Sequence, residues 1–169
     1  HPDLPPFFGG VVGYAAYDLV RYYERLPSLK PDDLGLPDLL FVEPEVVAVF
    51  DHLKNLLHLV APGRDPEEAE ARLFWAERRL KGPLPGVPGE RAGGRARFQA
   101  DFSREAYLEA VRRALDYIRA GDIFQVVGSQ RFSAPVQAPP LDVYRALRSV
   151  NPSPYMFLLE LDGFSLVGA

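Results

Sequence analysis

The chain has 169 residues, of which 47% are hydrophobic and 25% charged, and its formal net charge is -4. This composition is typical of a soluble globular domain with a substantial core. The absence of a basic block argues against nucleic acid as a partner. The chain has no cysteine, which excludes disulfides, and no apolar run nears the roughly 18 residues of a membrane helix. Because no signal peptide is visible, we expect a cytoplasmic protein with no membrane partner.

The first predicted elements are a glycine-rich strand and a short helix. Residues 9–14 hold three glycines without the spacing of a dinucleotide-binding loop. We expect a strand there that another backbone or a bulky ring approaches closely. A helix is predicted over residues 14–25, where Asp18 and Arg21 are spaced for a surface ion pair. Residues 28–38 follow as a loop rich in Pro, Asp and Gly.

Two strands joined by a turn are predicted next. Residues 39–50 and 53–60 are rich in branched and aromatic side chains, and residues 51–55 supply the turn. Glu43 and Pro44 interrupt the first strand. Proline lacks the amide that a central strand needs, so the interruption indicates an edge or a bulge.

A helix is predicted over residues 65–81, because its start carries a full set of capping residues. Asp65 is the expected N-cap, Pro66 occupies the first helical position, and Glu68 is expected to complete a capping box. The predicted buried stripe is Ala69, Leu73, Ala76 and Leu80. Residues 82–97 are expected to be a linker, since Pro and Gly recur there at nearly every second position.

The longest predicted helix leads into a strand with mixed side chains. Ser103 is the expected N-cap, and Gly121 ends the helix where a left-handed residue is favoured. Residues 121–132 are rich in β-branched and aromatic side chains and are predicted to form a strand. Alternation along that strand places Gln125 among apolar side chains, which fits either a pocket wall or a core strand with polar ends.

The last predicted elements are a helix over residues 140–150 and a hairpin of strands over residues 155–161 and 164–168. Antiparallel hairpins interspersed with helices predict the α+β class rather than a doubly wound parallel sheet. The chain begins at His1 and ends at Ala169, directly after a predicted strand, so we expect a piece of a longer protein.

Five runs of residues, in a fixed order, carry a resemblance to a known family. They are residues 6–14, 17–21, 24–27, 121–132 and 151–157. Together they resemble the chorismate-utilising enzymes, and in particular the large subunit of anthranilate synthases. The resemblance implies an α+β fold in which antiparallel sheets pack face to face with helices outside.

The resemblance also implies how the chain is divided. Residues 1–81 would belong to an N-terminal subdomain, residues 82–97 to the linker, and residues 98–169 to the start of the chorismate-binding catalytic domain.

For the whole enzyme, the resemblance implies that ammonia adds to chorismate with magnesium as cofactor. Pyruvate is then eliminated, and anthranilate is released for tryptophan synthesis. The ammonia would come from a glutamine amidotransferase partner. The family's magnesium ligands and main catalytic motifs lie beyond Ala169, so we expect no metal site in residues 1–169 and no turnover by them alone.

Gln125 is the candidate catalytic residue that the resemblance supplies. In the relatives that make isochorismate, the aligned residue is a lysine that activates water, and a buried lysine can serve as a base. A glutamine amide takes no proton near neutral pH. Gln125 therefore fits a site whose nucleophile, ammonia, arrives already basic. The alternative is that its amide only satisfies a buried backbone group.

A regulatory tryptophan site is implied at Asn151, Pro154, Tyr155 and Met156. Proline holds the backbone rigid, the tyrosine and methionine offer apolar contact to an indole, and the asparagine offers polar groups. A pre-set pocket of this kind loses less entropy on binding. The alternative is a helix-to-strand turn with core aromatic residues.

The resemblance makes Gly168 and Ala169 the start of a substrate-side turn. It also shows one departure from the family, because Gly128 stands where relatives usually carry a larger apolar residue. This glycine leaves a gap or allows a bulge in the strand.

Two other functions compete with this interpretation. The first is the para-aminobenzoate branch, aminodeoxychorismate synthase, which shares the ammonia chemistry but usually has a different motif at residues 123–127. The run at residues 151–156 also favours the anthranilate side. The second is a module that senses an amino acid without catalysis, which would bind tryptophan at micromolar levels.

Overall fold

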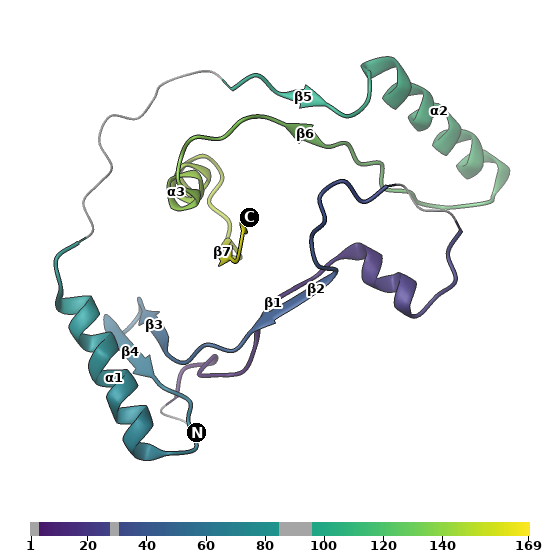
Figure 1. Ribbon diagram of the computed structural model, residues 1–169. Coiled ribbons are helices and arrows are strands. Elements are labelled where there is room, and N and C mark those ends of the chain that lie inside the picture. The colour runs from purple at the N-terminus through teal and green to yellow at the C-terminus, as the bar shows by residue number, and fades with distance from the viewer. Residues whose placement is uncertain (1–3, 28–30, 85–95) are drawn as a thin grey trace. The chain divides into compact units, whose positions relative to one another are not determined.

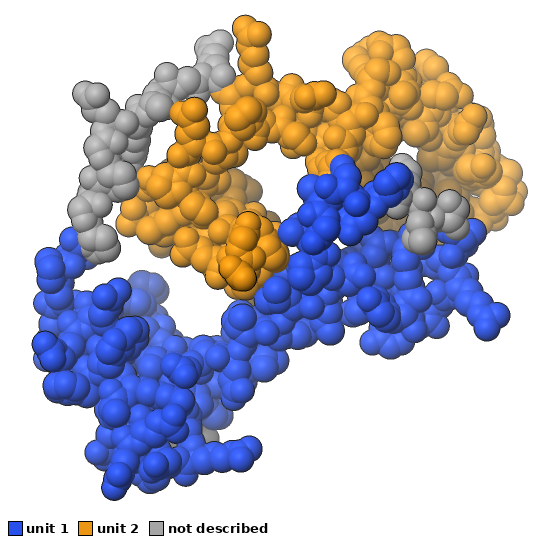
Figure 2. Space-filling model, in the orientation of Figure 1, with its two compact units in different colours: residues 1–86 blue, residues 87–169 orange. Residues whose placement is uncertain are grey.

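A computed structural model describes residues 4–27, 31–84 and 96–169 of the chain. The chain forms two compact units, residues 1–86 and 87–169 (Figure 2). The linker predicted over residues 82–97 falls mostly outside the described residues.

Unit 1 contains two antiparallel strand pairs and one long helix (Figure 1). Its elements are β1 (Val12–Ala15), the 3-10 helix η1 (Tyr17–Tyr22), β2 (Leu39–Val42), β3 (Val47–Asp51), β4 (Leu56–Val60) and α1 (Pro66–Lys81). Strand β1 pairs with β2, and β3 pairs with β4.

The glycine-rich strand confirms the expected close approach of another backbone. Gly13 in β1 lies opposite Phe41 in β2. A Cβ atom at Gly13 would collide with the Leu40 carbonyl oxygen and would lie 2.7 Å from the Phe41 Cα. Glycine is therefore needed here because the neighbouring strand occupies the space of a side chain.

The helix predicted over residues 14–25 is only partly correct. The structure has the end of β1 and then the short helix η1, with no side-chain hydrogen bond at its N-cap. A 3-10 helix seldom extends beyond a few residues, since its hydrogen-bond geometry is poorer than that of an α-helix. The predicted ion pair is present, with 2.6 Å between Arg21 Nε and Asp18 Oδ1.

The strand predicted over residues 39–50 divides into β2 and β3 at Glu43 and Pro44, as the interruption indicated. The turn from β3 to β4 is built on Asp51, whose Oδ1 accepts the amides of Leu53 and Lys54, each at 3.0 Å. Chiefly the Lys54 amide lowers the pKa of the Asp51 carboxyl below its ordinary value of 3.8.

Helix α1 begins as its sequence predicts, with one exception. Asp65 Oδ1 accepts the Glu67 amide at 3.0 Å and so caps the helix. The capping box expected from Glu68 is wrong, because this carboxylate pairs with Arg72 one turn further along, at 2.8 Å. An oppositely charged partner four residues on outcompetes the backbone amide for the carboxylate. Ala76 in the predicted stripe is buried, whereas Leu80 is half exposed.

Unit 2 contains two further antiparallel pairs and two helices (Figure 1). Its elements are β5 (Gln99–Ala100), α2 (Arg104–Ala120), β6 (Phe132–Ser133), α3 (Pro140–Val150), β7 (Phe157–Leu161) and β8 (Phe164–Gly168). Helix α2 has the predicted ends: Ser103 Oγ accepts the Ala106 amide at 3.1 Å, and Gly121 is left-handed with φ 82°.

The strand predicted over residues 121–132 is wrong for nearly all of its length. Only Phe132 belongs to a strand, β6, which pairs with β5 over two residues. A strand depends on hydrogen bonds to a neighbouring strand, and in the described part of the chain no strand pairs with residues 123–130. Phe124 is 92% exposed and Val127 82% exposed, so these two side chains are uncovered.

The C-terminal elements follow the prediction closely. Helix α3 covers residues 140–150, and it packs on the hairpin of β7 and β8. Leu161 pairs with Phe164 at the hairpin turn, where Gly163 has φ 81°. Helices and antiparallel pairs together confirm the α+β class. The described residues form four two-stranded antiparallel sheets.

The substantial core expected from composition is absent from the described residues. Ala76 is their one buried hydrophobic residue, and many large apolar side chains are exposed. None of the described helices is long and apolar enough to cross a membrane.

Candidate functional site

The segment that carries Gln125 is fixed at its start by the end of α2. The Gly121 amide donates to the Ile118 carbonyl at 3.1 Å, and the Asp122 amide donates to the Tyr117 carbonyl at 3.0 Å. These bonds satisfy the last carbonyls of the helix and turn the chain back beside it.

The far end of the same segment is fixed to the chain that precedes α2. Gln130 Nε2 donates to the Phe102 carbonyl at 2.9 Å. Arg131 Nε lies 3.0 Å from Asp101 Oδ2, and the Asp101 amide donates to the Arg131 carbonyl at 3.1 Å. The segment around Gln125 is thus an extended strip held at both ends.

Gln125 itself is exposed and lies outside any sealed apolar interior. Ile123 and Val126 line a hollow of about 520 Å³ against α2, with Ala110 and Tyr117 on the helix side. Gln125 is not among the residues that line this hollow. Among the described residues no hydrogen bond involves its amide. The catalytic assignment of Gln125 stays a prediction.

The segment at residues 151–156 leaves helical geometry, as its prolines require. Asn151 ends α3 with φ -139° and ψ 76°, and the Tyr155 amide donates to Ser153 Oγ at 3.4 Å. Asn151 and Pro154 are exposed and Met156 is half-buried, while Tyr155 is 85% exposed. The aromatic ring is therefore available to a ligand or to another segment, and the tryptophan site stays a prediction.

Gly168 has a structural reason to be glycine. It lies opposite Phe157 in the β7–β8 hairpin, and a Cβ atom there would collide with the Phe157 ring. Ala169 follows it and is exposed. The place of these residues beside a substrate stays a prediction.

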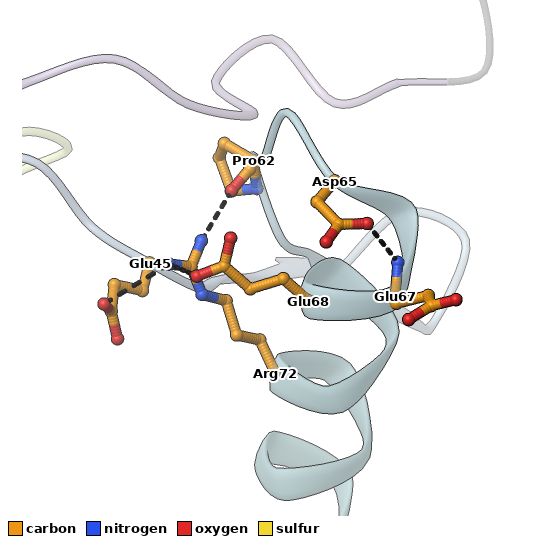
Figure 3. Close-up of polar contacts among 6 residues, drawn as sticks. All are labelled: Glu45, Pro62, Asp65, Glu67, Glu68 and Arg72. Atoms are coloured by element: carbon orange, nitrogen blue, oxygen red, sulfur yellow. Dashed lines mark hydrogen bonds and ion pairs between the residues drawn. The ribbon is translucent and has the colours of Figure 1, made fainter.

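Arg72 is the centre of a polar cluster in unit 1 that joins α1 to the chain on both sides of the β3–β4 pair (Figure 3). Arg72 Nη1 donates to the Pro62 carbonyl at 3.0 Å. Arg72 Nη2 lies 2.8 Å from Glu68 Oε1 and 3.4 Å from Glu45 Oε1. The guanidinium side chain is 25% exposed, so these contacts are partly shielded from water.

Sequence reasoning missed this cluster, although one signal for it was present. Glu68 and Arg72 are four residues apart on a helix, which is the spacing of a favourable ion pair with the acid first. The bond to Pro62 and the contact with Glu45 had no signal in the sequence, because they depend on how the helix packs on the hairpin.

The described residues contain no group of three or more His, Asp or Glu side chains that could hold a metal ion. They therefore offer no site that fits magnesium.

Comparisons with known proteins bear on the whole chain. The family model described as chorismate binding enzyme matches residues 1–169. Anthranilate synthase component 1 from Thermus thermophilus is 89% identical over 169 residues, which is 100% of this chain and 37% of that protein. The protein of the same name from Pseudomonas aeruginosa is 45% identical over 179 residues, covering 99% of this chain and 36% of its own length.

A solved structure is similar over the full chain. The crystal structure of anthranilate synthase component I from Streptococcus pneumoniae has a TM-score of 0.89 and 35% identity, and the match covers 100% of this chain and 40% of that one. The chain spans little more than a third of the length of the curated relatives. Since the family model and these relatives cover the chain from end to end, the chain belongs to the chorismate binding enzyme family.

Proposed function

We propose that this chain is part of the large subunit of an anthranilate synthase, a lyase that converts chorismate and ammonia to anthranilate and pyruvate. The observation that carries the proposal is the 89% identity, over all 169 residues, to a protein named anthranilate synthase component 1. The relatives reported above share that name, which favours the anthranilate branch over the para-aminobenzoate branch. The product would serve tryptophan biosynthesis.

We assign Gln125 to the side of the site from which the nucleophile approaches. Its exposure and the fixed ends of its segment support this, since the amide is free to face a cavity completed by other parts of a longer subunit. An amide offers hydrogen bonds to ammonia but removes no proton from water. The site is therefore suited to a nucleophile that is basic before it arrives.

The proposal includes feedback inhibition by tryptophan at residues 151–156. The exposed ring of Tyr155 and the rigid backbone after Asn151 support a pocket for an aromatic amino acid. Side chains from elsewhere in a longer subunit would complete that pocket.

The remaining parts of the proposal concern cofactor, partner and compartment. Magnesium would have its ligands on parts of the subunit other than residues 1–169. A glutamine amidotransferase subunit would supply ammonia from glutamine. The enzyme would work in the cytoplasm.

The test uses the full-length subunit with chorismate, magnesium and an ammonium salt. Release of anthranilate, followed by its fluorescence, and inhibition by added tryptophan are the expected results. Formation of aminodeoxychorismate, or tryptophan binding without any turnover, would overturn the proposal in favour of one of the two competing functions.

A single substitution tests the role of Gln125. Gln125→Lys in the full-length subunit places a potential base where the water-adding relatives have one. We expect loss of anthranilate synthesis and the appearance of some isochorismate, measured by chromatography. Gln130→Lys is a matched control, because Gln130 anchors the segment to the Phe102 carbonyl and its replacement should not create isochorismate. Complete absence of isochorismate from the Gln125→Lys protein would contradict the assignment.

A further inference from the structure

The Gln125 strip, residues 123–130, runs beside α2 in the direction opposite to the helix. At its start, Ile123 lines the hollow against α2 together with Tyr117, which lies in the last turn of the helix. At its end, Gln130 Nε2 donates to the Phe102 carbonyl, one residue before the N-cap of α2. The strip therefore begins beside the last turn of α2 and ends beside its first turn.

Alternate residues of the strip meet successive turns of α2. Val126 lines the hollow together with Ala110 on the helix. A Cβ atom built at Gly128 would lie 3.5 Å from the Tyr107 hydroxyl oxygen, one turn nearer the start of the helix. Gln130 reaches the carbonyl just before the helix. Two residues of extended chain advance roughly 6.6 Å and one helical turn advances roughly 5.4 Å, so the two repeats match along this length.

This arrangement turns Gln125 away from α2. Side chains alternate along an extended chain, so residues 126, 128 and 130 face the helix while Gln125 and Val127 face the other way. Val127 is 82% exposed and Gln125 does not line the hollow, as the alternation requires. The alternation starts after Phe124, which lies in a bend directly after the end of α2. All of these contacts lie within unit 2, so they direct Gln125 whatever segment of a longer subunit covers its side of the strip.

We propose that Gln130 is a positioning residue for the addition of ammonia, because its bond to the Phe102 carbonyl keeps the Gln125 amide turned toward the nucleophile. The proposal rests on the proposed function, which places Gln125 on the nucleophile side of the site. Among the three contacts with the helix side, the Gln130 bond is the directional one, whereas the contacts of Val126 and Gly128 are van der Waals contacts that permit sliding. A slip of one residue would exchange the two faces of the strip and turn Gln125 onto α2.

The neighbouring anchor explains why the loss of this bond should misdirect Gln125 rather than unfold the region. The Asp101 amide donates to the Arg131 carbonyl at 3.1 Å, and Arg131 Nε lies 3.0 Å from Asp101 Oδ2. These bonds do not use the Gln130 side chain, so they hold the end of the strip when Gln130 is replaced. A small displacement of a positioned group can lower a reaction rate strongly, so the effect should appear in the use of ammonia.

The test compares variants of the full-length subunit with chorismate, magnesium and an ammonium salt. Gln130→Leu and Gln130→Glu both remove the donor, one with a neutral and one with a negative side chain, whereas Gln130→Lys keeps a donor long enough to reach the carbonyl. We expect kcat/KM for ammonia to fall by about fivefold or more without the donor and to stay within about twofold in Gln130→Lys. The KM for chorismate should stay within about twofold in every variant. Arg72→Met, which alters the cluster in unit 1 away from the strip, should change neither quantity.

Hydrogen exchange gives a second readout that does not depend on turnover. The backbone amides of residues 123–129 should exchange about fivefold faster or more in Gln130→Leu, and at the original rate in Gln130→Lys. Equal exchange in all the proteins, or faster exchange with an unchanged kcat/KM for ammonia, would overturn the proposal. A wild-type subunit that makes no anthranilate would overturn the proposed function and with it the role in ammonia addition, while the exchange rates would still decide whether Gln130 holds the strip.

Discussion

Replacing Gly121 and Gly128 by alanine separates the conformational role of a glycine from its spatial role. Both residues flank the segment that carries Gln125. Gly121 has φ 82° and open space around a built Cβ atom, so any cost of alanine there is conformational. Gly128 has no left-handed φ, and a Cβ atom there would lie 3.5 Å from the Tyr107 hydroxyl, which is ordinary van der Waals contact.

The magnitudes follow from these two environments. A left-handed conformation costs an L-residue roughly 1–2 kcal/mol, so Gly121→Ala should destabilise by about 1 kcal/mol after the entropy gained in the unfolded chain. Gly128→Ala carries no such cost and should stabilise by about 0.5 kcal/mol through the same entropy term. The two variants should therefore differ by about 1.5 kcal/mol, with Gly121→Asn between Gly and Ala because asparagine tolerates this conformation.

The assay is urea unfolding of the full-length subunit, monitored by circular dichroism. The free energies of unfolding are compared only between variants whose dependence on urea concentration has the same slope. The reasoning would be refuted by an alanine at position 121 that costs no stability, or by an alanine at position 128 that costs as much as the one at position 121.

Three further changes have defined outcomes. Gly13→Ala should destabilise by more than about 3 kcal/mol or prevent folding, since its Cβ atom would occupy the space of the Leu40 carbonyl; a loss under 1 kcal/mol in urea unfolding would contradict this. Arg72→Met should lower the free energy of unfolding by about 1–2 kcal/mol, because it removes one partly shielded hydrogen bond and the ion pairs of Arg72. The control Arg112→Met removes one exposed ion pair at 3.4 Å and should cost under about 0.5 kcal/mol. Equal losses of stability in the two variants would argue against the cluster. The pKa of the Asp51 carboxyl is lowered in the folded protein. Its contribution to stability is therefore present above its ordinary pKa of 3.8 and is lost as the pH falls through the lower folded value. An NMR titration midpoint at or above 3.8 would show that the hydrogen bonds of the turn are absent.

The helix ends could be predicted because their signals are local. Asp65 and Ser103 each accept an amide two or three residues ahead, and Gly121 adopts the left-handed conformation that ends α2. Contacts between near neighbours in sequence decide these features. The hairpin turn at Gly163 could be predicted for the same reason.

Features that depend on distant partners could not be predicted. The side chains at residues 121–132 favour a strand, but a strand forms only where another strand lies beside it, and β5 supplies two residues. Glu68 is a different case, because two local patterns, a capping box and an ion pair with Arg72 four residues on, competed for one carboxylate. The amino-acid pattern thus records a preference, and packing decides whether the preference is met.

The candidate site could be proposed only from the resemblance. Gln125 and Tyr155 are exposed and lie on separate segments of unit 2, and no charge pattern in the sequence marks either as functional. Their surroundings depend on parts of a longer subunit, since the chain covers 37% of the length of a close relative.

The two anchors of the Gln125 segment have a consequence for the order of folding. Gln130 bonds to Phe102, 28 residues earlier, and Arg131 pairs with Asp101 on the same side of α2. Closing a loop of 28 residues costs on the order of 3 kcal/mol, and each doubling of its length adds only about 0.6 kcal/mol. The helix and its returning strip can assemble from neighbours in sequence alone. The Gln125 strip can therefore take its place beside α2 before residues more distant in sequence are ordered.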